Sequence, residues 1–317
     1  MGDNKTTDSP HDKRLRELFH NKKAFVSLLK DCVREPWIDD LDIDSLQRKD
    51  TGFMTTDFEK REVDVLWEGT IDNGKDRVMF YALNENQSRV DYRMSYRLLI
   101  YMTEILRDYY NQSDPKERKR KGFKFPVVVP IIFYTGRKKW SVSRHLKDMF
   151  AGYKRFGDSV LNFSYAIVDV KGYDENSVQD FGSNLLKMMV LLEKSRNFDE
   201  IVETVKKHKG EIQELDEEEQ RVFNIALDLF DQIYGKNQSY KLREIVYKEN
   251  AGEVDVMLAD VLANAKNLEK KIRREGKEEK AIEMATKMLL KDKPMDEIIE
   301  FTGLSEGKIR GIEKTLK

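Results

Sequence analysis

The sequence is poor in the features that define disulfide-bonded, secreted and membrane-spanning proteins. Cys32 is the single cysteine in 317 residues, which excludes an intrachain disulfide and a metal site built from several cysteines. The first residues contain no apolar segment of the signal-peptide kind, and no stretch of about 18 apolar residues occurs along the chain. We therefore expect a cytoplasmic protein with no membrane partner.

An excess of charge of either sign is missing as well. The formal net charge is -1, so the chain as a whole does not attract nucleic acid, and contact with DNA has to come from a local basic patch. One such patch is the run KERKRKGFK over residues 116–124, which holds six cations and one glutamate. It is either a solvated loop or a phosphate-binding surface, with Lys119 and Arg120 as candidate DNA contacts.

What the sequence does contain is a large share of both apolar and charged residues. With 39% hydrophobic and 36% charged residues, the chain can bury a core and still keep much solvated helical surface, which predicts an α/β protein rich in helix. Its length favours one large domain with appendages, or two domains. The periodicity along the chain predicts a disordered segment over residues 1–10, an α/β core over 11–175, a helical region over 176–250, and a long helix with a helix-turn-helix-like tail over 251–317.

Two β-rich runs with an Asn-Gly pair between them predict a hairpin. The runs are REVDVLWEGTI and DRVMFYALNENQ, and four residues that include Asn73-Gly74 separate them. An Asn-Gly pair in this setting is the strongest short-range hairpin signal. Closing the turn at this pair sets Asp64 opposite Leu83.

This register divides the hairpin into two faces, because side chains alternate along a strand and cross-strand partners share a face. One face is apolar and is the expected core face; its residues are Val63, Val65, Trp67, Phe80 and Ala82. The other face carries Asp64, Leu83, Glu85 and Gln87. Acids and an amide therefore gather where the second strand leaves the core.

Asp64 and Glu85 are diagonal neighbours in this register, which sets their Cβ atoms about 7–8 Å apart. Two carboxylates at this spacing can share one Mg²⁺ or Mn²⁺ ion, and such an ion supports phosphodiester hydrolysis. The alternative is that both are ordinary solvent-facing acids on a half-exposed hairpin. Spacing alone leaves both interpretations open.

The remaining periodicity predicts a mixed sheet covered by helices. SYRLLIYMTEILRDYY is typical of an amphipathic helix, FPVVVPIIFYTG of a strand buried on both faces, and NFSYAIVDV of a further strand. The first helix is expected to break near Asn21. Residues 34–60 are rich in acids and are expected to form mostly loop, with room for one short strand.

Four stretches, in this order, resemble the recombination-promoting nuclease (Rpn) or YhgA-like transposase family, a branch of the PD-(D/E)XK nuclease superfamily. They are HDKRLRELF, REVDVLW, ENQSRVDYRMSYRLLIYM and VVVPIIFYTGRKKW, and the tail AIEMATKMLLKDKPMDEIIEFTGLSEGKI is similar to the tail common in that family. The resemblance covers about the first 175 residues and the last 40. It implies a restriction-endonuclease-like mixed sheet flanked by helices, and a Mg²⁺-dependent DNA endonuclease that promotes recombination or acts on mobile or foreign DNA.

The resemblance also assigns roles at the strand end. Asp64 takes the place of the first metal-binding acid, Glu85 the second, and Gln87 the place that many nucleases give to Lys. An amide can orient water and hydrogen-bond a phosphate oxygen, but it cannot neutralise charge. Asp12 matches the acid on the first helix, where it is either a third metal ligand or a helix cap.

Further DNA contacts follow from the same resemblance. Arg97 and Tyr101 lie four residues apart and share one helix face, so they either reach phosphate or form an ion pair and a packed ring. In YTGRKKW, Gly136 is expected to make the turn after the buried strand. The next three residues are phosphate contacts or part of a solvated loop; they are Arg137, Lys138 and Lys139. The four histidines show no metal-ligand spacing and are expected at the surface; they are His11, His20, His145 and His208.

Two other function classes compete with the nuclease. One is a non-catalytic DNA-binding or assembly protein that keeps the nuclease fold and self-associates through its tail. The other is a helical interaction protein with a small α/β core. The long charged helices after Glu253 predict a homodimer, and the helix pair split at Thr302-Gly303 is either a DNA-reading helix-turn-helix or a hairpin that packs on its neighbours.

Overall fold

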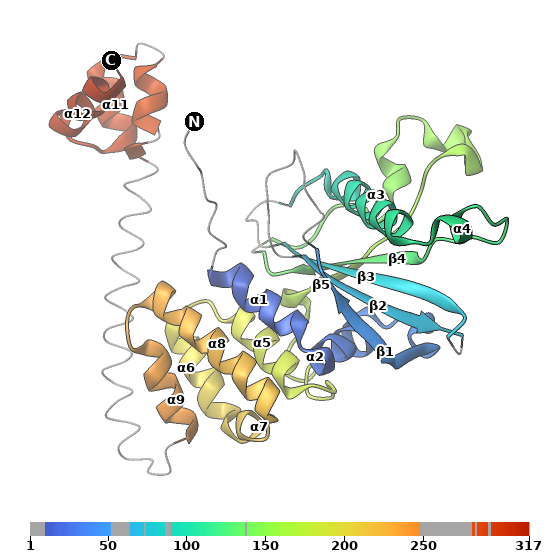
Figure 1. Cartoon of the computed structure of the whole chain (residues 1–317). Helices are drawn as coiled ribbons and strands as arrows, with labels where there is room; N and C mark the ends of the chain where they lie inside the picture. The colour runs from blue at the N-terminus through green and yellow to red at the C-terminus, as the bar shows by residue number, and fades with distance from the viewer. Residues whose placement is uncertain are drawn as a thin grey trace. The chain divides into compact units, whose positions relative to one another are not determined.

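The computed structural model describes residues 10–51, 64–72, 74–85, 90–136, 138–247, 281–282, 284–290 and 293–316. The chain forms two compact units, a larger one of Met1–Ile233 with Asn237–Glu249 and a smaller one of Tyr234–Lys236 with Asn250–Lys317 (Figure 1).

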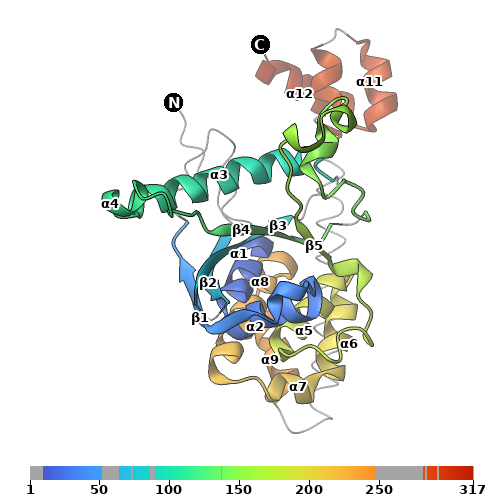
Figure 2. The same cartoon turned by 90° about the vertical axis from the view of Figure 1, so that its right-hand side faces the viewer.

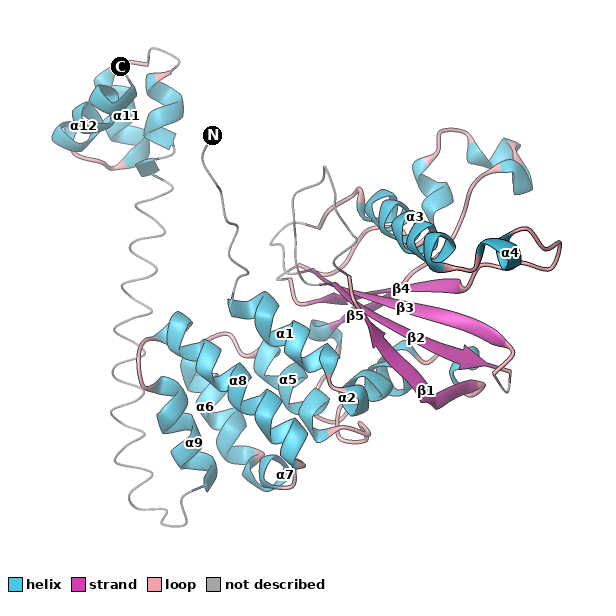
Figure 3. Cartoon of the chain, in the orientation of Figure 1, coloured by secondary structure: helices cyan, strands magenta, loops and turns pink. Residues whose placement is uncertain are grey.

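The larger unit combines a sheet with helices on both sides and a group of further helices (Figure 3). Its main elements are α1 (Pro10–His20), α2 (Lys22–Ser27), β1 (Leu41–Lys49), β2 (Asp64–Ile71), β3 (Asp76–Glu85), α3 (Met94–Gln112), α4 (Pro115–Arg118), β4 (Val127–Tyr134), β5 (Ala166–Asp169), α5 (Asn184–Lys194), α6 (Phe198–Lys207), α7 (Lys209–Gln213), α8 (Glu217–Tyr234) and α9 (Gln238–Tyr247). A π-helical turn (Leu28–Val33) and short 3₁₀ helices (Pro36–Ile38, Leu146–Met149, Tyr153–Arg155, Gly157–Ser159 and Val170–Gly172) join them.

The five strands form one mixed sheet in the order β1-β2-β3-β4-β5. The pairs β1–β2 and β2–β3 are antiparallel, whereas β3–β4 and β4–β5 are parallel. Helix α3 supplies the long connection that two parallel neighbours such as β3 and β4 require. This architecture confirms the predicted α/β, nuclease-like fold, in which a mixed sheet with flanking helices is followed by a helical region.

The hairpin register predicted from the Asn-Gly pair is confirmed. Asp64 pairs with Leu83, and the pairing continues to Ile71 opposite Asp76. In the turn, Gly74 has a φ of +84°, a left-handed conformation that glycine adopts without steric cost. The chemistry of the turn therefore fixes which residues of β2 and β3 meet.

The predicted core face of the hairpin packs on the amino-terminal helices. Phe25 of α2 stacks on Trp67 with ring centroids 5.3 Å apart, and the indole Nε1 donates a hydrogen bond of 3.0 Å to the Phe19 carbonyl of α1. Phe19 also meets Phe133 of β4 edge to face at 5.0 Å. This side of the sheet is sealed by α1 and α2 (Figure 2).

The opposite face is buried too, because α3 covers it (Figure 2). Leu66 and Leu83 are 2% exposed and pack in one cluster with Leu98 of α3. Tyr81 meets Tyr101 of α3 with centroids 5.5 Å apart. Residues 65–67 and 78–83 of the hairpin are thus covered on both faces of the sheet, whereas residues 74–77 at its turn are exposed. The side chains of Asp64 and Glu85 lie outside the described residues, so both interpretations of these acids stay predictions.

The segment expected to be mostly loop contains the nine-residue edge strand β1. Its pairing with β2 is interrupted between Asp42 and Gln47. There the Asp42 carboxylate accepts the backbone N–H of Asp44, and the Ser45 hydroxyl accepts the N–H of Thr70 at 2.9 Å. An edge strand needs only one buried side and tolerates such a bulge. Its sequence is therefore rich in acids and lacks a regular alternation of apolar and polar residues, which is why the sequence predicts mostly loop here.

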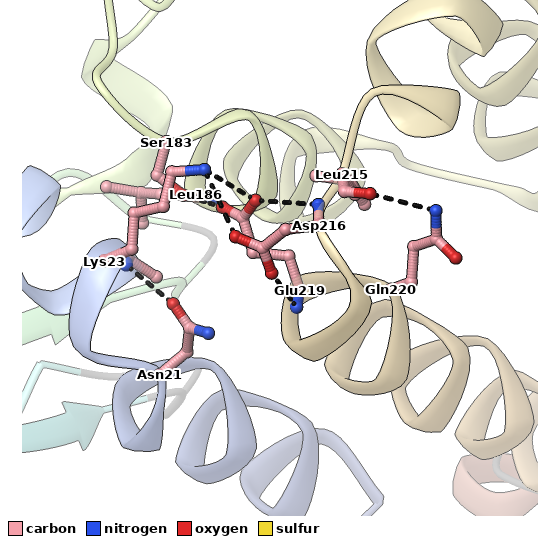
Figure 4. Close-up of polar contacts among 9 residues, drawn as sticks. Asn21, Lys23, Ser183, Leu186, Leu215, Asp216, Glu219 and Gln220 are labelled. Atoms are coloured by element: carbon pink, nitrogen blue, oxygen red, sulfur yellow. Dashed lines mark hydrogen bonds and ion pairs between the residues drawn. The ribbon is translucent and has the colours of Figure 1, made fainter.

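Helices α2, α5 and α8 meet at a buried carboxylate (Figure 4). The side chain of Glu219 in α8 is 1% exposed, and its oxygens accept from Lys23 Nζ at 2.8 Å and from the Ser183 hydroxyl at 3.0 Å. The same hydroxyl caps α5 by accepting the backbone N–H of Leu186. One carboxylate therefore joins the helical region to α2, which packs beneath the sheet.

The smaller unit contains α11 (Met295–Thr302) and α12 (Glu306–Leu316). The two helices separate at Gly303, whose φ of 67° ends α11, as the sequence predicted. Ile298, Leu304 and Ile309 form a small buried cluster with Ala285. Most of the long helix predicted after Glu253 lies outside the described residues, so dimerisation through it stays a prediction. Among the helices that the structure describes, none is long and apolar enough to cross a membrane.

Candidate active site

The two strands that carry the candidate acids meet at one end of the sheet. β2 begins at Asp64 and β3 ends at Glu85. Asp64 pairs with Leu83, and Glu85 pairs with Tyr134 at the end of β4. The two acids are thus diagonal in the backbone register, as the sequence predicted. Their side chains, and Gln87 as a whole, lie outside the described residues.

Helix α1 brings its first turn to the same end of the sheet. The Thr135 hydroxyl, one residue after Tyr134, lies 3.4 Å from His11 Nε2. Asp12 follows, with a carboxylate oxygen 3.6 Å from His11 Nδ1 and a side chain that is 31% exposed. The first turn of α1, which carries Asp12, therefore contacts the chain just after β4, the strand that pairs with Glu85. A carboxylate in the first turn also interacts favourably with the helix dipole.

His11 is buried, and the expectation that it lies at the surface is wrong. Its side chain is 15% exposed, and Nε2 lies 2.7 Å from Glu193 at the end of α5. The other Glu193 oxygen binds Arg14, whose guanidinium also lies 4.7 Å from the Phe230 ring of α8. His208 is buried as well, at 7%, beside Glu211.

These surroundings raise the pKa of His11. Burial by itself lowers the pKa, but the Glu193 carboxylate and the hydrogen bonds with Asp12 and Glu193 outweigh it and raise the pKa to about 9. Burial likewise raises the pKa of Glu193, and the charges of Arg14 and His11 outweigh it and hold that pKa below its usual value. At neutral pH an imidazolium therefore stands beside Asp12 and fixes the first turn of α1.

Gly136 and Trp140 of the YTGRKKW stretch pack against the ring of Tyr134. Tyr134 is fully buried, and Trp140 meets it edge to face at 5.0 Å. A Cβ atom on Gly136 would overlap the Tyr134 ring. The Tyr134 ring therefore leaves room only for glycine at position 136. This position follows β4, at the end of the sheet where β3 ends at Glu85.

The candidate DNA contacts differ in accessibility. Arg97 is 12% exposed and pairs with Asp91 at 3.3 Å, and Tyr101 is 6% exposed in the core under α3. These two residues form an ion pair and a packed ring. The other described candidates are exposed, and Arg120 is paired with Glu117 at 2.6 Å; they are Lys119, Arg120, Lys138 and Lys139. Arg137 lies outside the described residues.

No group of three or more His, Cys, Asp or Glu side chains in the described part of the chain could hold a metal ion. The carboxylates of Asp64 and Glu85 lie outside the described residues, so the Mg²⁺ or Mn²⁺ site stays a prediction. What the backbone provides is two acid positions in diagonal register, and a first turn of α1, carrying Asp12, that meets the end of β4 through His11 and Thr135. Hard oxygen donors of this kind suit Mg²⁺.

Comparison with known proteins agrees with the resemblance read from the sequence. Recombination-promoting nuclease RpnA of Escherichia coli K12 is 22% identical over 308 residues, which cover 96% of this chain and 97% of that protein. Recombination-promoting nuclease RpnD of Escherichia coli O157:H7 is 25% identical over 142 residues, or 44% of this chain and 51% of that protein. No solved structure gives a significant match. The family described as "Putative transposase, YhgA-like" matches residues 9–223, from the start of α1 into α8, and the chain belongs to this family.

Proposed function

We propose that this protein is a metal-dependent DNA endonuclease that promotes recombination or acts on mobile or foreign DNA. The names of the relatives, both recombination-promoting nucleases, support nuclease activity. The observation that carries the proposal is the register of the hairpin: Asp64 pairs with Leu83, and Glu85 lies two residues further along β3. The strand end at Glu85, together with Asp12 of α1, is the proposed reaction centre.

In this proposal the acids hold one divalent ion and the neighbouring polar groups hold the DNA. Asp64 and Glu85 supply carboxylate oxygens, and Asp12 supplies a third. When bound, Mg²⁺ or Mn²⁺ would provide a Lewis acid for the phosphoryl oxygen and lower the pKa of a bound water. The Gln87 amide donates to a phosphate oxygen or orients water.

Charged residues around this centre have supporting roles. Lys138 and Lys139 are exposed just after β4, where they can neutralise DNA phosphates. The His11 imidazolium holds the first turn of α1, and therefore Asp12, against Glu193. In this proposal His11 and Glu193 position Asp12 but do not contact the reacting atoms.

The test is plasmid cleavage by the purified protein with Mg²⁺, with Mn²⁺ or with EDTA. We expect cleavage only with a metal, and a loss of about a hundredfold or more in Asp64→Asn and Glu85→Gln, because several kcal/mol of transition-state stabilisation disappear. Asp76→Asn is the matched control, since Asp76 is an exposed acid at the opposite end of β3.

Two outcomes would contradict the proposal. Equal cleavage by the wild type and by the two strand-end variants would make these acids structural. Binding of DNA without cleavage under any metal condition would instead support the alternative function, a non-catalytic DNA-binding or assembly protein that keeps the nuclease fold.

A further inference from the structure

Four aromatic rings gather where α3 ends and β4 is about to begin; we call them the aromatic platform (Tyr109, Tyr110, Phe123 and Phe125). Tyr110 and Phe125 stack with centroids 6.1 Å apart, and Phe123 meets Phe125 edge to face at 5.4 Å. Tyr110 is 41% and Phe125 49% exposed. Rings of this size are usually buried, so two half-exposed rings in one cluster indicate a binding surface.

The rings of the platform flank the basic run of residues 116–124, and Phe123 lies inside it. The Arg118 guanidinium sits 4.7 Å from the centre of the Tyr110 ring. Lys119, Lys121 and Lys124 are exposed and form no ion pair with another described residue. Stacking faces interleaved with free cations are the combination by which proteins hold single-stranded nucleic acid, since bases stack on the rings while cations neutralise the backbone.

A cavity of about 880 Å³ opens beside the platform, between α3 and the sheet. Tyr109, Phe123 and Lys124 line one side of it, and Leu66 and Met79 of the sheet lie on its wall. Five acids line the cavity against three cations; they are Asp50, Glu68, Asp108, Asp114 and Glu117, with Lys49, Arg77 and Lys124. The excess of negative charge disfavours phosphate inside the cavity, whereas an unpaired base can enter and donate from its exocyclic amine to a carboxylate.

We propose that the aromatic platform binds unpaired DNA by base stacking and guides a single strand toward the strand end of β3. This deepens the proposed nuclease function and rests on it. A base inside a duplex cannot offer its face to these rings, whereas an unpaired base can. The surface is therefore specific for single-stranded or locally opened DNA, and the phosphate backbone follows the lysine side.

The sheet sets the length of strand that this geometry requires. β3 and β4 run in parallel from the platform, where Val78 pairs with Val127, to the candidate site, where Glu85 pairs with Tyr134. At about 3.3 Å per residue this distance is about 23 Å. At about 3.4 Å per nucleotide, the rise of a stacked strand, about seven nucleotides span both places, and a more extended single strand needs fewer.

The first experiment measures the affinity for a fluorescent single strand of mixed sequence, about 20 nucleotides long and unable to pair with itself, and for a duplex of the same sequence, both in EDTA so that no cleavage occurs. We expect Phe125→Ala and Tyr110→Ala each to weaken single-strand binding by about fivefold or more, while duplex binding stays within twofold or so. Phe125→Tyr and Tyr110→Phe keep a ring and should retain single-strand binding. Phe156→Ala is the control, because Phe156 is 62% exposed at a distant loop.

The outcomes separate this inference from the nuclease proposal. Unchanged single-strand binding in both alanine variants, together with cleavage that needs Glu85, would overturn the platform and leave the nuclease standing. Weaker single-strand binding in a protein that never cleaves would support the platform as a DNA-binding surface and refute the nuclease. A change in sedimentation without a change in DNA binding would make the rings a protein interface and overturn the inference.

Discussion

Raising the pH from 6 to 9 is expected to destabilise the larger unit by about 3 kcal/mol through His11 alone. The pKa of His11 is 6.5 in its ordinary state and about 9 in the folded protein. Each pH unit between these values is worth about 1.4 kcal/mol, and the side chain is only 15% exposed, so solvent screens the interaction little.

The direction follows from which state holds the proton. Below pH 6.5 both the folded and the unfolded chain bind it, and the full stabilisation is present. Between pH 6.5 and about 9 the unfolded chain has released the proton while folded His11 keeps it beside Glu193. Unfolding then releases a proton, and the free energy of unfolding falls with each unit of pH until the folded pKa is passed.

Urea unfolding in EDTA at several values between pH 6 and 9, followed by tryptophan fluorescence, measures this loss. Trp37, Trp67 and Trp140 are the three tryptophans, and all lie in the larger unit. His11→Gln should be less stable than the wild type at pH 6 and show a flatter pH dependence. His145→Gln, at an exposed histidine, should keep the wild-type dependence. An unchanged slope in His11→Gln would refute the reasoning.

Two pairs of substitutions test the packing. Gly136→Ala should lower the free energy of unfolding by about 1–3 kcal/mol, because the new methyl group displaces the buried Tyr134 ring. Gly122→Ala should leave it nearly unchanged, since a Cβ atom there meets open space. Equal urea midpoints for the two variants would contradict this reasoning. Glu219→Gln should lower the free energy of unfolding by about 1–3 kcal/mol, because its charged hydrogen bonds weaken. Lys23→Met should lower it by under about 1 kcal/mol, because Lys23 is half exposed. A larger loss in Lys23→Met than in Glu219→Gln would contradict the view that the buried carboxylate is the more important partner.

Local signals in the sequence predicted the sheet well. The Asn-Gly turn fixed a register that pairs Asp64 with Leu83, and the unbroken apolar run over β4 identified a strand covered on both faces. Both depend on residues within one or two elements of each other. The diagonal placement of Asp64 and Glu85 followed from that register.

What the sequence did not reveal depends on distant partners. His11 is buried because it meets Glu193, 182 residues later, and no local pattern around a histidine near a helix start signals such a partner. Tyr101 and Arg97 share a helix face with apolar residues, but only the position of α3 against the sheet decides that the ring is covered. The four rings of the platform come from two segments, the end of α3 and the residues before β4, and only the folded structure shows that these segments lie together.

The contacts of α1 also set an order for synthesis and folding. Its apolar residues leave the ribosome before α5 and α8 have been made, yet Arg14 needs Glu193 and Phe230 for its contacts. At about 5–20 residues per second, some 10–40 s pass before α8 has been made. During that interval Leu15 and Leu18, which are 0% exposed in the finished fold, lack part of their covering. We therefore expect α1 to expose apolar surface on the nascent chain, and its packing against the sheet to be completed only after the helical region has been made.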